Sequence, residues 1–449
     1  MRHFHFTTAL LPEGWANDVV IAVEDGVIAD MSVGGPCPPF TDRLPGAAIP
    51  GIPNLHSHAH QRAAAGLTER SKDESSQGSD SFWTWRQTMY RAAAAITPED
   101  LEIIARQAFI EMLQGGYTHV AEFHYLHHAP DGRPYADPAE MSRRIVAAAE
   151  AAGIGLTLLP VLYAAGGFGG EAVEAGQRRF ACDADGFAAM RATLPPPSPG
   201  HVHGIAPHSL RAVPPDALRA ALEAAPQGPV HIHVAEQRRE VEECLAARGQ
   251  RPVAWLLDHA AVDARWCLVH ATHADDAEVA RMAASGAVVG LCPTTEADLG
   301  DGIFPAEAYV TAGGRFGVGS DSQVASGWAD ELRLLEWGQR LVTNRRTVLA
   351  GGPGRSTGRS LIEAAAVAGA QACGIVAGQI EVGMRADITV LAPVRPGDAA
   401  LDTAVFAPRH AVRHVVVRGD CVVRDGKHRL AEVAAEAFRR VVDRLAEAV

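Results

Sequence analysis

The middle of the chain alternates short apolar runs with longer stretches in which apolar residues recur at helical spacing. The runs cover residues 49–52, 118–123, 155–162, 202–206, 230–234, 266–270, 287–292 and 316–319. A helix is predicted to begin after Thr97, because Pro98 and an early acidic turn follow this cap residue, and to end at Gly115. Eight strand–helix units over about 270 residues predict a (β/α)8 barrel of the TIM type, an α/β fold.

The two ends of the chain have a different pattern. Residues 1–48 and 376–430 contain short alternating apolar runs separated by turn dipeptides, which is typical of antiparallel strands. We expect them to form one small β-sandwich domain together, beside a barrel domain at residues 49–375. Residues 431–449 predict a C-terminal helix, which can pack either on the barrel or on a partner.

Charge and composition narrow the possible functions. The 53 acidic and 40 basic residues give a formal net charge of -13, which argues against a nucleic-acid partner. No apolar stretch reaches membrane-spanning length, and the first residues lack a signal-peptide core, so no membrane role is expected. The seven cysteines are widely spaced, as expected for reduced thiols in the cytoplasm.

Histidines and an aspartate follow three of the predicted strands, where barrel enzymes place their chemistry. His56 and His58 are two residues apart on an extended segment and therefore point to the same side. His233 ends the fifth strand and Asp321 follows the eighth, whereas His231 lies one layer deeper and is interpreted as a core residue. Three imidazoles and one carboxylate predict a single divalent metal, zinc or another borderline divalent ion, with a position left for water.

These motifs resemble the amidohydrolase superfamily over nearly the whole chain. The resemblance is carried by residues 53–58, by His233 with Glu236, by His270, by residues 319–321 and by residues 383–388. Many members hold two metals bridged by a modified lysine, but the only lysines are Lys72 and Lys427, outside every predicted strand. The chain is therefore more similar to the one-metal adenosine, cytosine and guanine deaminases. A carboxylate bridge through Glu122 remains open.

The same resemblance implies roles for three catalytic residues. Glu236 would carry a proton between the attacking water and the departing ammonia, although a glutamate at a strand end can also simply be a surface residue. His270 would polarise the water and steady the tetrahedral intermediate, or alternatively be a packed histidine. Asp321 would serve both as a catalytic residue and as a metal ligand.

A second set of motifs concerns the substrate. Two arginines, Arg86 and Arg211, occur near the predicted barrel mouth of an acidic protein, which suggests a substrate with carboxylates. Arg86 belongs to an aromatic segment, residues 81–86, predicted to precede the first regular helix and to act either as a lid or as a packed amphipathic turn. Further polar motifs lie at residues 58–63, 121–125, 127–128 and 207–211.

Together these motifs resemble the formimidoylglutamate deiminase family, with one departure, His60 in place of the family's phenylalanine. The resemblance implies hydrolysis of N-formimino-L-glutamate to N-formyl-L-glutamate and ammonia in histidine degradation, by a homodimer. It also implies five substrate contacts: Gln61, Arg86, Tyr125, His208 and Arg211. Two alternatives remain, namely another one-metal aminohydrolase acting on guanine, an adenosine-like compound or a triazine, and a non-catalytic metal-stabilised scaffold.

Overall fold

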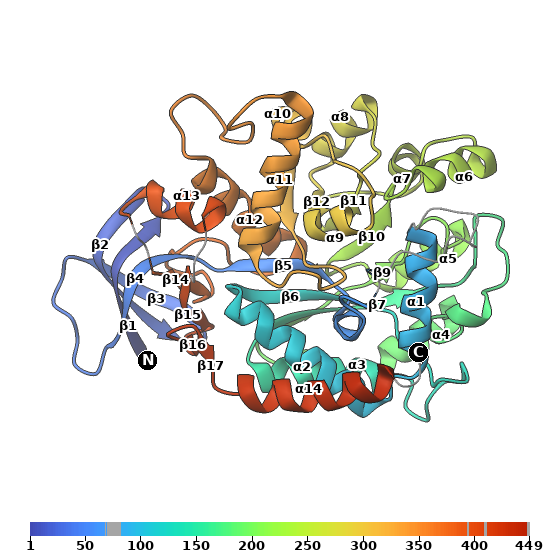
Figure 1. Ribbon diagram of the computed structural model, residues 1–449, viewed down its shortest axis with the longest axis horizontal. Coiled ribbons are helices and arrows are strands. Elements are labelled where there is room, and N and C mark those ends of the chain that lie inside the picture. Colours follow the sequence, from blue (N-terminus) through green and yellow to red (C-terminus); the bar gives the residue numbers. More distant parts are fainter. Residues whose placement is uncertain (68, 70–81, 393–394, 408–410, 447–449) are drawn as a thin grey trace.

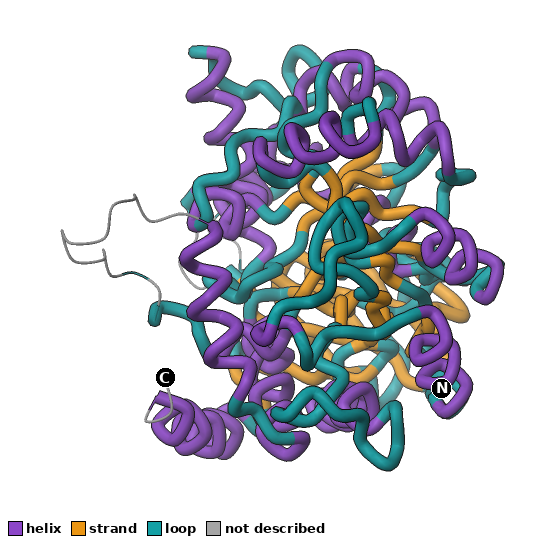
Figure 2. Tube along the Cα trace, turned by 90° about the vertical axis from the view of Figure 1, so that its right-hand side faces the viewer, coloured by secondary structure: helices purple, strands orange, loops and turns teal. Residues whose placement is uncertain are grey.

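The computed structural model describes the chain except residues 68, 70–81, 393–394, 408–410 and 447–449. A barrel of parallel strands occupies its centre, with helices around it (Figures 1 and 2). The barrel strands are β5 (Ile52–Ser57), β6 (Tyr117–His124), β7 (Gly155–Leu162), β8 (His201–His203) with β9 (Ala206–Pro207), β10 (Val230–Val234), β11 (Trp266–His270), β12 (Val288–Leu291) and β13 (Arg315–Val318). Parallel bridges Ser57–Asp321 and Ile205–Val230 join the two sheet segments, which confirms the predicted barrel.

Helices connect the strands and cover the barrel. They are α1 (Phe82–Ala94), α2 (Pro98–Gln114), α3 (Glu140–Ala152), α4 (Ala184–Thr193), α5 (Pro215–Ala224), α6 (Arg238–Arg248), α7 (Pro252–His259), α8 (Asp276–Ser285), α9 (Pro293–Asp298), α10 (Ala306–Thr311), α11 (Trp328–Thr343) and α12 (Thr357–Cys373), with 3-10 turns at Ala59–Ala63 and Ala175–Gln177. Helix α2 begins as predicted, because Thr97 and Asp100 satisfy each other's backbone N–H groups in a capping box. Within the described residues, no helix has the length and apolar character that crossing a membrane requires.

The first barrel strand differs from the prediction. Residues 49 and 50 belong to β4 (Asp42–Pro50), where they pair with Thr389 and Ile388, and the barrel strand begins only at Ile52. Gly51 lies between the two strands, so close to Thr118 that a Cβ atom there would lie 2.5 Å from its hydroxyl oxygen. The apolar run is buried on both sides of this glycine, and hydrophobicity alone therefore did not reveal that it is shared between two sheets.

The two chain ends form one continuous eight-stranded sheet. Its hydrogen-bonded order is β17-β16-β15-β14-β4-β1-β2-β3, so the antiparallel β4–β14 pair joins the N-terminal and C-terminal halves. The other strands are β1 (Arg2–Leu11), β2 (Gly14–Glu24), β3 (Val27–Val33), β14 (Ile388–Leu391), β15 (Val412–Val417), β16 (Asp420–Arg424) and β17 (Lys427–His428). Phe6, Ile21 and Ile388 belong to one apolar core of this sheet, which confirms that the chain ends share a β domain. The residue limits assigned to the domains stay a prediction.

Two helices differ from the predicted pattern, and the predicted C-terminal helix is present. Residues 82–94 are already helical in α1, so the aromatic segment is not a loop; Ser81 lies outside the described residues. Helix α13 (Asp398–Phe406) was not predicted. Helix α14 (Ala431–Ala446) lies along α2 (Figure 1), where Arg444 forms an ion pair with Asp100. It therefore packs on the barrel of its own chain; residues 447–449 lie outside the described residues.

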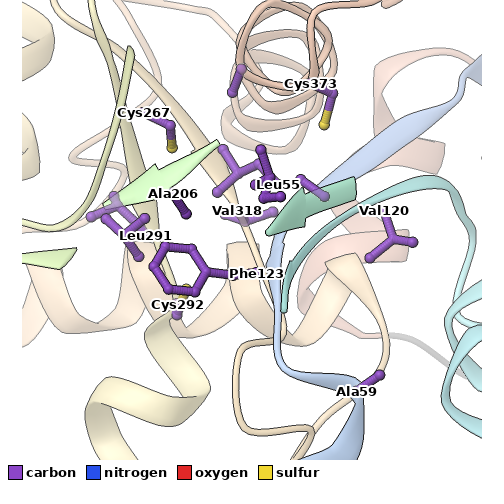
Figure 3. Packing of buried hydrophobic residues seen from close by; sticks show 14 of the residues in the cluster. Leu55, Ala59, Val120, Phe123, Ala206, Cys267, Leu291, Cys292, Val318 and Cys373 are labelled. Carbon is purple, nitrogen blue, oxygen red and sulfur yellow. The ribbon is translucent and has the colours of Figure 1, made fainter. Parts of the chain in front are cut away.

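The barrel interior below the strand ends is apolar. Leu55, Phe123, Leu291 and Val318 point into it from four different strands and are fully buried (Figure 3). Such a floor keeps water away from the polar side chains above it and strengthens the electrostatic interactions among them.

Candidate active site

Four predicted metal ligands converge at the carboxyl ends of the barrel strands. His56 Nε2 lies 3.1 Å from His233 Nε2 and 3.7 Å from an oxygen of Asp321. His58 Nε2 lies 3.4 Å from that same oxygen. All four side chains are buried, and a buried carboxylate such as that of Asp321 requires a charged partner or a metal.

The hydrogen bonds behind these rings define which nitrogen faces the cluster. His58 Nδ1 donates to the carbonyl oxygen of Phe123 at 2.9 Å, and His233 Nδ1 donates to that of His208 at 3.0 Å. Since a carbonyl can only accept, each ring carries its proton on Nδ1 and presents the lone pair of Nε2 to the cluster. Burial lowers the pKa of His58 to about 3 and keeps His233 neutral as well. Neutral imidazole lone pairs beside a carboxylate are the donor set of a divalent metal.

A buried polar network holds the two halves of this cluster together. Asn54 exchanges hydrogen bonds with the side chain and backbone of Ser320, next to Asp321. Gln323 donates to the hydroxyl of Ser57, which in turn donates to Glu122 at 2.6 Å. Both oxygens of Glu122 are engaged, the second by the backbone N–H of Ala59 at 2.7 Å. Glu122 thus supports the segment that carries His56 and His58.

Glu236 and His270 lie beside the cluster. His270 Nε2 is 3.6 Å from the second oxygen of Asp321 and 3.8 Å from Glu236, and its Nδ1 is 3.2 Å from Glu296. Although burial lowers the pKa of His270, the carboxylates of Glu236, Glu296 and Asp321 raise it to about 10. Burial raises the pKa of Glu236. The pair therefore combines a carboxyl group that holds a proton more readily than an exposed glutamate with a cationic hydrogen-bond donor.

The backbone at these strand ends is strained. Ala235, His270 and Asp321 have φ angles of 52°, 68° and 45°, in the left-handed region that non-glycine residues rarely adopt. Each turn redirects a side chain from the strand to the centre of the barrel mouth. Such strain persists where the surrounding structure holds it and is typical of functional sites.

A cavity opens above the cluster, and all five predicted substrate contacts line it: Gln61, Arg86, Tyr125, His208 and Arg211. Gln61 donates to the hydroxyl of Tyr125 at 2.6 Å. Within the described part of the chain, neither Arg86 nor Arg211 has a carboxylate within the 4.0 Å of an ion pair. Two half-buried guanidinium groups that form no ion pair with a described carboxylate provide a binding surface for anionic groups.

Sequence reasoning missed the aromatic wall of this cavity. Tyr90 comes from α1, Tyr163 from the end of β7 and Phe180 from the loop before α4. Tyr163 directly follows a predicted strand, and that position could have identified it. Tyr90 and Phe180 carry no such signal, because an aromatic residue at a helix or loop position is usually part of the core.

The fold and the site define a hydrolase of the amidohydrolase class, and residues 47–422 match the family model described as "Amidohydrolase family". Residues 1–39 match the model "Formimidoylglutamate deiminase HutF, N-terminal domain". The chain belongs to the amidohydrolase family and, within it, to the formimidoylglutamate deiminases. It is 52% identical to the formimidoylglutamate deiminase of Pseudomonas aeruginosa over 97% of this chain and 98% of that protein.

Two solved structures are similar over almost the whole chain. The crystal structure of an amidohydrolase from Brucella melitensis is 48% identical, with a TM-score of 0.93, and the match covers 99% of this chain and 100% of that one. An adenosine deaminase from Xanthomonas campestris with bound zinc has a TM-score of 0.80 at 23% identity, covering 99% and 98%, and shares the fold. A 5-methylthioadenosine/S-adenosylhomocysteine deaminase from Natronomonas pharaonis is 26% identical over 89% of this chain and 87% of that protein.

Proposed function

We propose that the chain hydrolyses N-formimino-L-glutamate to N-formyl-L-glutamate and ammonia, as a step in histidine degradation. The observation that carries this proposal is the cavity itself, in which two arginines that form no ion pair with a described carboxylate lie beside a histidine–aspartate cluster. A substrate with two carboxylates and a hydrolysable amidine matches both features. The close relative named formimidoylglutamate deiminase supports the same substrate.

One divalent metal, zinc, is proposed at His56, His58, His233 and Asp321. Borderline divalent ions such as zinc prefer neutral imidazole nitrogens combined with a carboxylate, and three or four protein ligands leave a position for water. When bound, such a metal lowers the pKa of that water and supplies a nucleophile near neutral pH.

Glu236 is the proposed proton carrier. Its carboxylate takes a proton from the water that attacks the amidine carbon, and then delivers a proton to the nitrogen that leaves as ammonia. The C–O bond forms before the C–N bond breaks, so the proton is needed on the nitrogen at the second step. Burial raises the pKa of Glu236, which allows the group to hold that proton between the two steps.

His270 is proposed to stabilise the charge that develops during the attack. Glu296 engages its Nδ1, which leaves Nε2 directed toward Asp321 and Glu236. A cationic N–H at this position can donate to the oxygen added to the amidine carbon. Glu296 thereby orients a ring that would otherwise be free to flip.

The substrate's charged groups are proposed to bind on the other side of the cavity. Arg86 and Arg211 each bind one carboxylate, while Gln61, Tyr125 and His208 form hydrogen bonds that position the chain between the carboxylates and the amidine. A purine or triazine offers no carboxylates, so an enzyme for those substrates would leave both guanidinium groups unused.

The test is ammonia release by zinc-loaded protein with N-formimino-L-glutamate, with guanine and adenosine measured in parallel. Turnover of the formimino compound alone is expected. Arg211→Ala is expected to lower kcat/KM by roughly 100-fold, because a charge-assisted, bidentate contact is lost. Arg219→Gln is the control, since Arg219 is an exposed arginine of α5 paired with Asp216. Turnover of a purine, or an unchanged Arg211→Ala variant, would contradict the proposal.

A cytoplasmic homodimer is proposed as the working form. All seven cysteines are free, as expected in a reducing compartment, and the family resemblance favours the dimer. Size-exclusion chromatography with light scattering tests the second point, where a monomeric mass would contradict it.

A further inference from the structure

We propose that Trp83 positions the two cavity arginines for a substrate with two carboxylates, and that Arg239 adds a third cation at the cavity mouth. The four residues Trp83, Arg86, Arg211 and Arg239 are called the arginine–tryptophan cluster below. The inference rests on the proposed function for its substrate class. It assigns to Trp83 a role in selecting dicarboxylates over monocarboxylates, and to Arg239 a role in attracting the anionic substrate.

Three guanidinium groups contact one aromatic ring. The guanidinium carbon of Arg239 lies 4.3 Å from the centre of the Trp83 ring, that of Arg86 4.7 Å and that of Arg211 5.5 Å. All three distances are within the range of a cation–π interaction. Among the described residues, every other aromatic ring that contacts an arginine in this way has no more than one such partner.

The three arginines come from separate parts of the barrel mouth. Arg86 follows Trp83 by three residues in α1, which places both on the same face of that helix. Arg211 follows β9, and Arg239 lies in the first turn of α6, three residues after Glu236. The Trp83 ring therefore connects α1 with the segment after β9, which carries Arg211, and with the start of α6, which follows Glu236.

An aromatic ring suits this position better than a carboxylate would. Like charges at short range repel, and this repulsion is strongest away from bulk water. An acidic side chain would relieve it but would also occupy the guanidinium donors that the substrate needs. A cation–π contact stabilises each arginine and leaves the in-plane N–H groups free to bind a carboxylate.

Arg239 is the outer member of the cluster. Its side chain is 58% exposed, and its ion-pair partner, Glu243, lies one helical turn further along α6 and is itself 34% exposed. Such a pair is weak and easily exchanged for another anion. In a protein with a net charge of -13, a local group of three arginines attracts an anionic substrate to the mouth.

We expect the cavity to select substrates with two carboxylates over substrates with one. A substrate with one carboxylate leaves one cavity arginine unpaired, and an unpaired buried charge disfavours binding. Trp83 matters for this discrimination because it keeps Arg86 and Arg211 at a fixed separation. Without the ring, each guanidinium can adopt other rotamers and the penalty for the shorter substrate decreases.

The experiment compares Trp83→Leu, Trp83→Phe and Arg239→Gln with wild type and with Arg219→Gln. Arg219 matches Arg239 as an exposed arginine paired along its helix, but it lies on α5 and, among the described residues, forms no cation–π contact with Trp83. Binding of N-acetyl-L-glutamate, a dicarboxylate without an amidine, is measured by calorimetry on the metal-loaded protein. Kinetics are measured with N-formimino-L-glutamate and with 4-(formimidoylamino)butanoate, which lacks the α-carboxylate.

Trp83→Leu is expected to weaken binding of N-acetyl-L-glutamate and to raise KM for N-formimino-L-glutamate, each about 10-fold, with a smaller effect on kcat. Its effect on the monocarboxylate is expected to be smaller, so that selectivity falls. Trp83→Phe should recover most of the loss, because a phenyl ring retains the cation–π contact. Arg239→Gln should raise KM about threefold at low ionic strength and have no effect at about 0.5 M salt.

Equal losses for both substrates in Trp83→Leu, or no change in its affinity for N-acetyl-L-glutamate, would overturn the role of Trp83. An effect of Arg239→Gln that persists at high salt, or that Arg219→Gln reproduces, would overturn the role of Arg239. If wild-type protein binds N-acetyl-L-glutamate but releases no ammonia from N-formimino-L-glutamate, the proposed reaction fails and the arginine–tryptophan cluster stands. If wild type binds no dicarboxylate, the cluster proposal fails.

Discussion

Glu240 holds the backbone of Glu236 in place. One oxygen of its carboxylate accepts from the N–H of Glu236 at 3.0 Å, and the other accepts from the N–H of Ala235 at 3.1 Å. Ala235 has a φ angle of 52°, so this contact stabilises a strained turn between the His233 strand and α6. Glu240 is thus a positioning residue: through these hydrogen bonds it defines where Glu236, the proposed proton carrier, lies.

Glu240→Ala is therefore expected to lower kcat about 10- to 100-fold, with less effect on KM, because the turn that directs Glu236 loses two buried hydrogen bonds. Glu240→Gln keeps one acceptor oxygen and should give an intermediate value. Glu242→Gln, an exposed change in the same helix, is the control. Steady-state kinetics measure the effect, and a Glu240→Ala variant with the kcat of wild type would show that the turn holds without this carboxylate.

Glu236 itself should be needed for proton transfer and not for binding. Glu236→Gln is expected to lower kcat by about 10²- to 10⁴-fold, which is the usual contribution of a general acid–base group. Its affinity for N-acetyl-L-glutamate should stay within about threefold of wild type, because the carboxylates bind to the arginines on the other side of the cavity. Calorimetry and ammonia release measure the two effects separately. A large loss of affinity would instead indicate that Glu236 supports the cavity.

The metal site is testable through two histidines of one strand. His233→Ala is expected to reduce bound metal from about one per chain to below a tenth, because a ligand is lost. His231→Gln should retain the metal although His231 is buried, since its Nε2 donates to the carbonyl oxygen of Ala372 at 2.8 Å. Elemental analysis by mass spectrometry measures the content. Metal loss in both variants would mean that disruption of the strand, and not loss of a ligand, accounts for it.

Chelation provides a second measurement on the same pair of variants. Metal that binds only the folded chain stabilises it by about 2.7 kcal/mol at a hundredfold excess over Kd. A chelator should therefore lower the melting temperature of wild type and of His231→Gln, while His233→Ala should hardly respond. An equal response in all three proteins would indicate that the chelator acts elsewhere.

The residues at strand ends were predictable because a parallel barrel places the carboxyl ends of all its strands at the same face. His58, His233 and Asp321 each follow an apolar run, and a parallel barrel brings the ends of such runs to one mouth. The family motifs added Arg86 and Arg211. The proposed metal ligands and substrate contacts were therefore all named from the strand-end positions together with the family motifs.

The supporting residues could not be predicted in this way, since their roles depend on contacts between elements. Glu240 and Glu296 lie on helices that follow the ligand strands, and on a helix a glutamate is ordinarily solvent-exposed. Trp83 acquires its role only because α1 folds over the mouth beside α6. The break between β4 and β5 at Gly51 could not be predicted either, because a continuous apolar run gives no sign of where one sheet ends and the next begins.

The cap of α2 should make stability depend on pH. Asp100 accepts from the backbone and hydroxyl of Thr97 at 2.9 and 2.7 Å, and from Arg444 of α14. Burial raises the pKa of Asp100, but the hydrogen bonds from Arg444 and Thr97 outweigh it and lower the pKa overall. A pKa lowered by folding stabilises the folded state above the unfolded value, about 3.9, and this stabilisation is lost as the pH falls through the folded value.

Asp100→Asn is therefore expected to lower the free energy of unfolding by about 1 kcal/mol at pH 7, which is the typical contribution of a helix cap. As the pH falls from 7 to well below the unfolded value of about 3.9, wild-type Asp100 becomes protonated, and the difference between the two proteins should shrink toward zero. Thermal unfolding of both proteins at the two pH values measures this difference. Asp216→Asn is the control, because Asp216 is 91% exposed and pairs with Arg219 within α5. A difference that is equal at both pH values would mean that Asp100 acts through its shape and hydrogen bonds and not through its charge, and α14 would then be held to α2 by its apolar face alone.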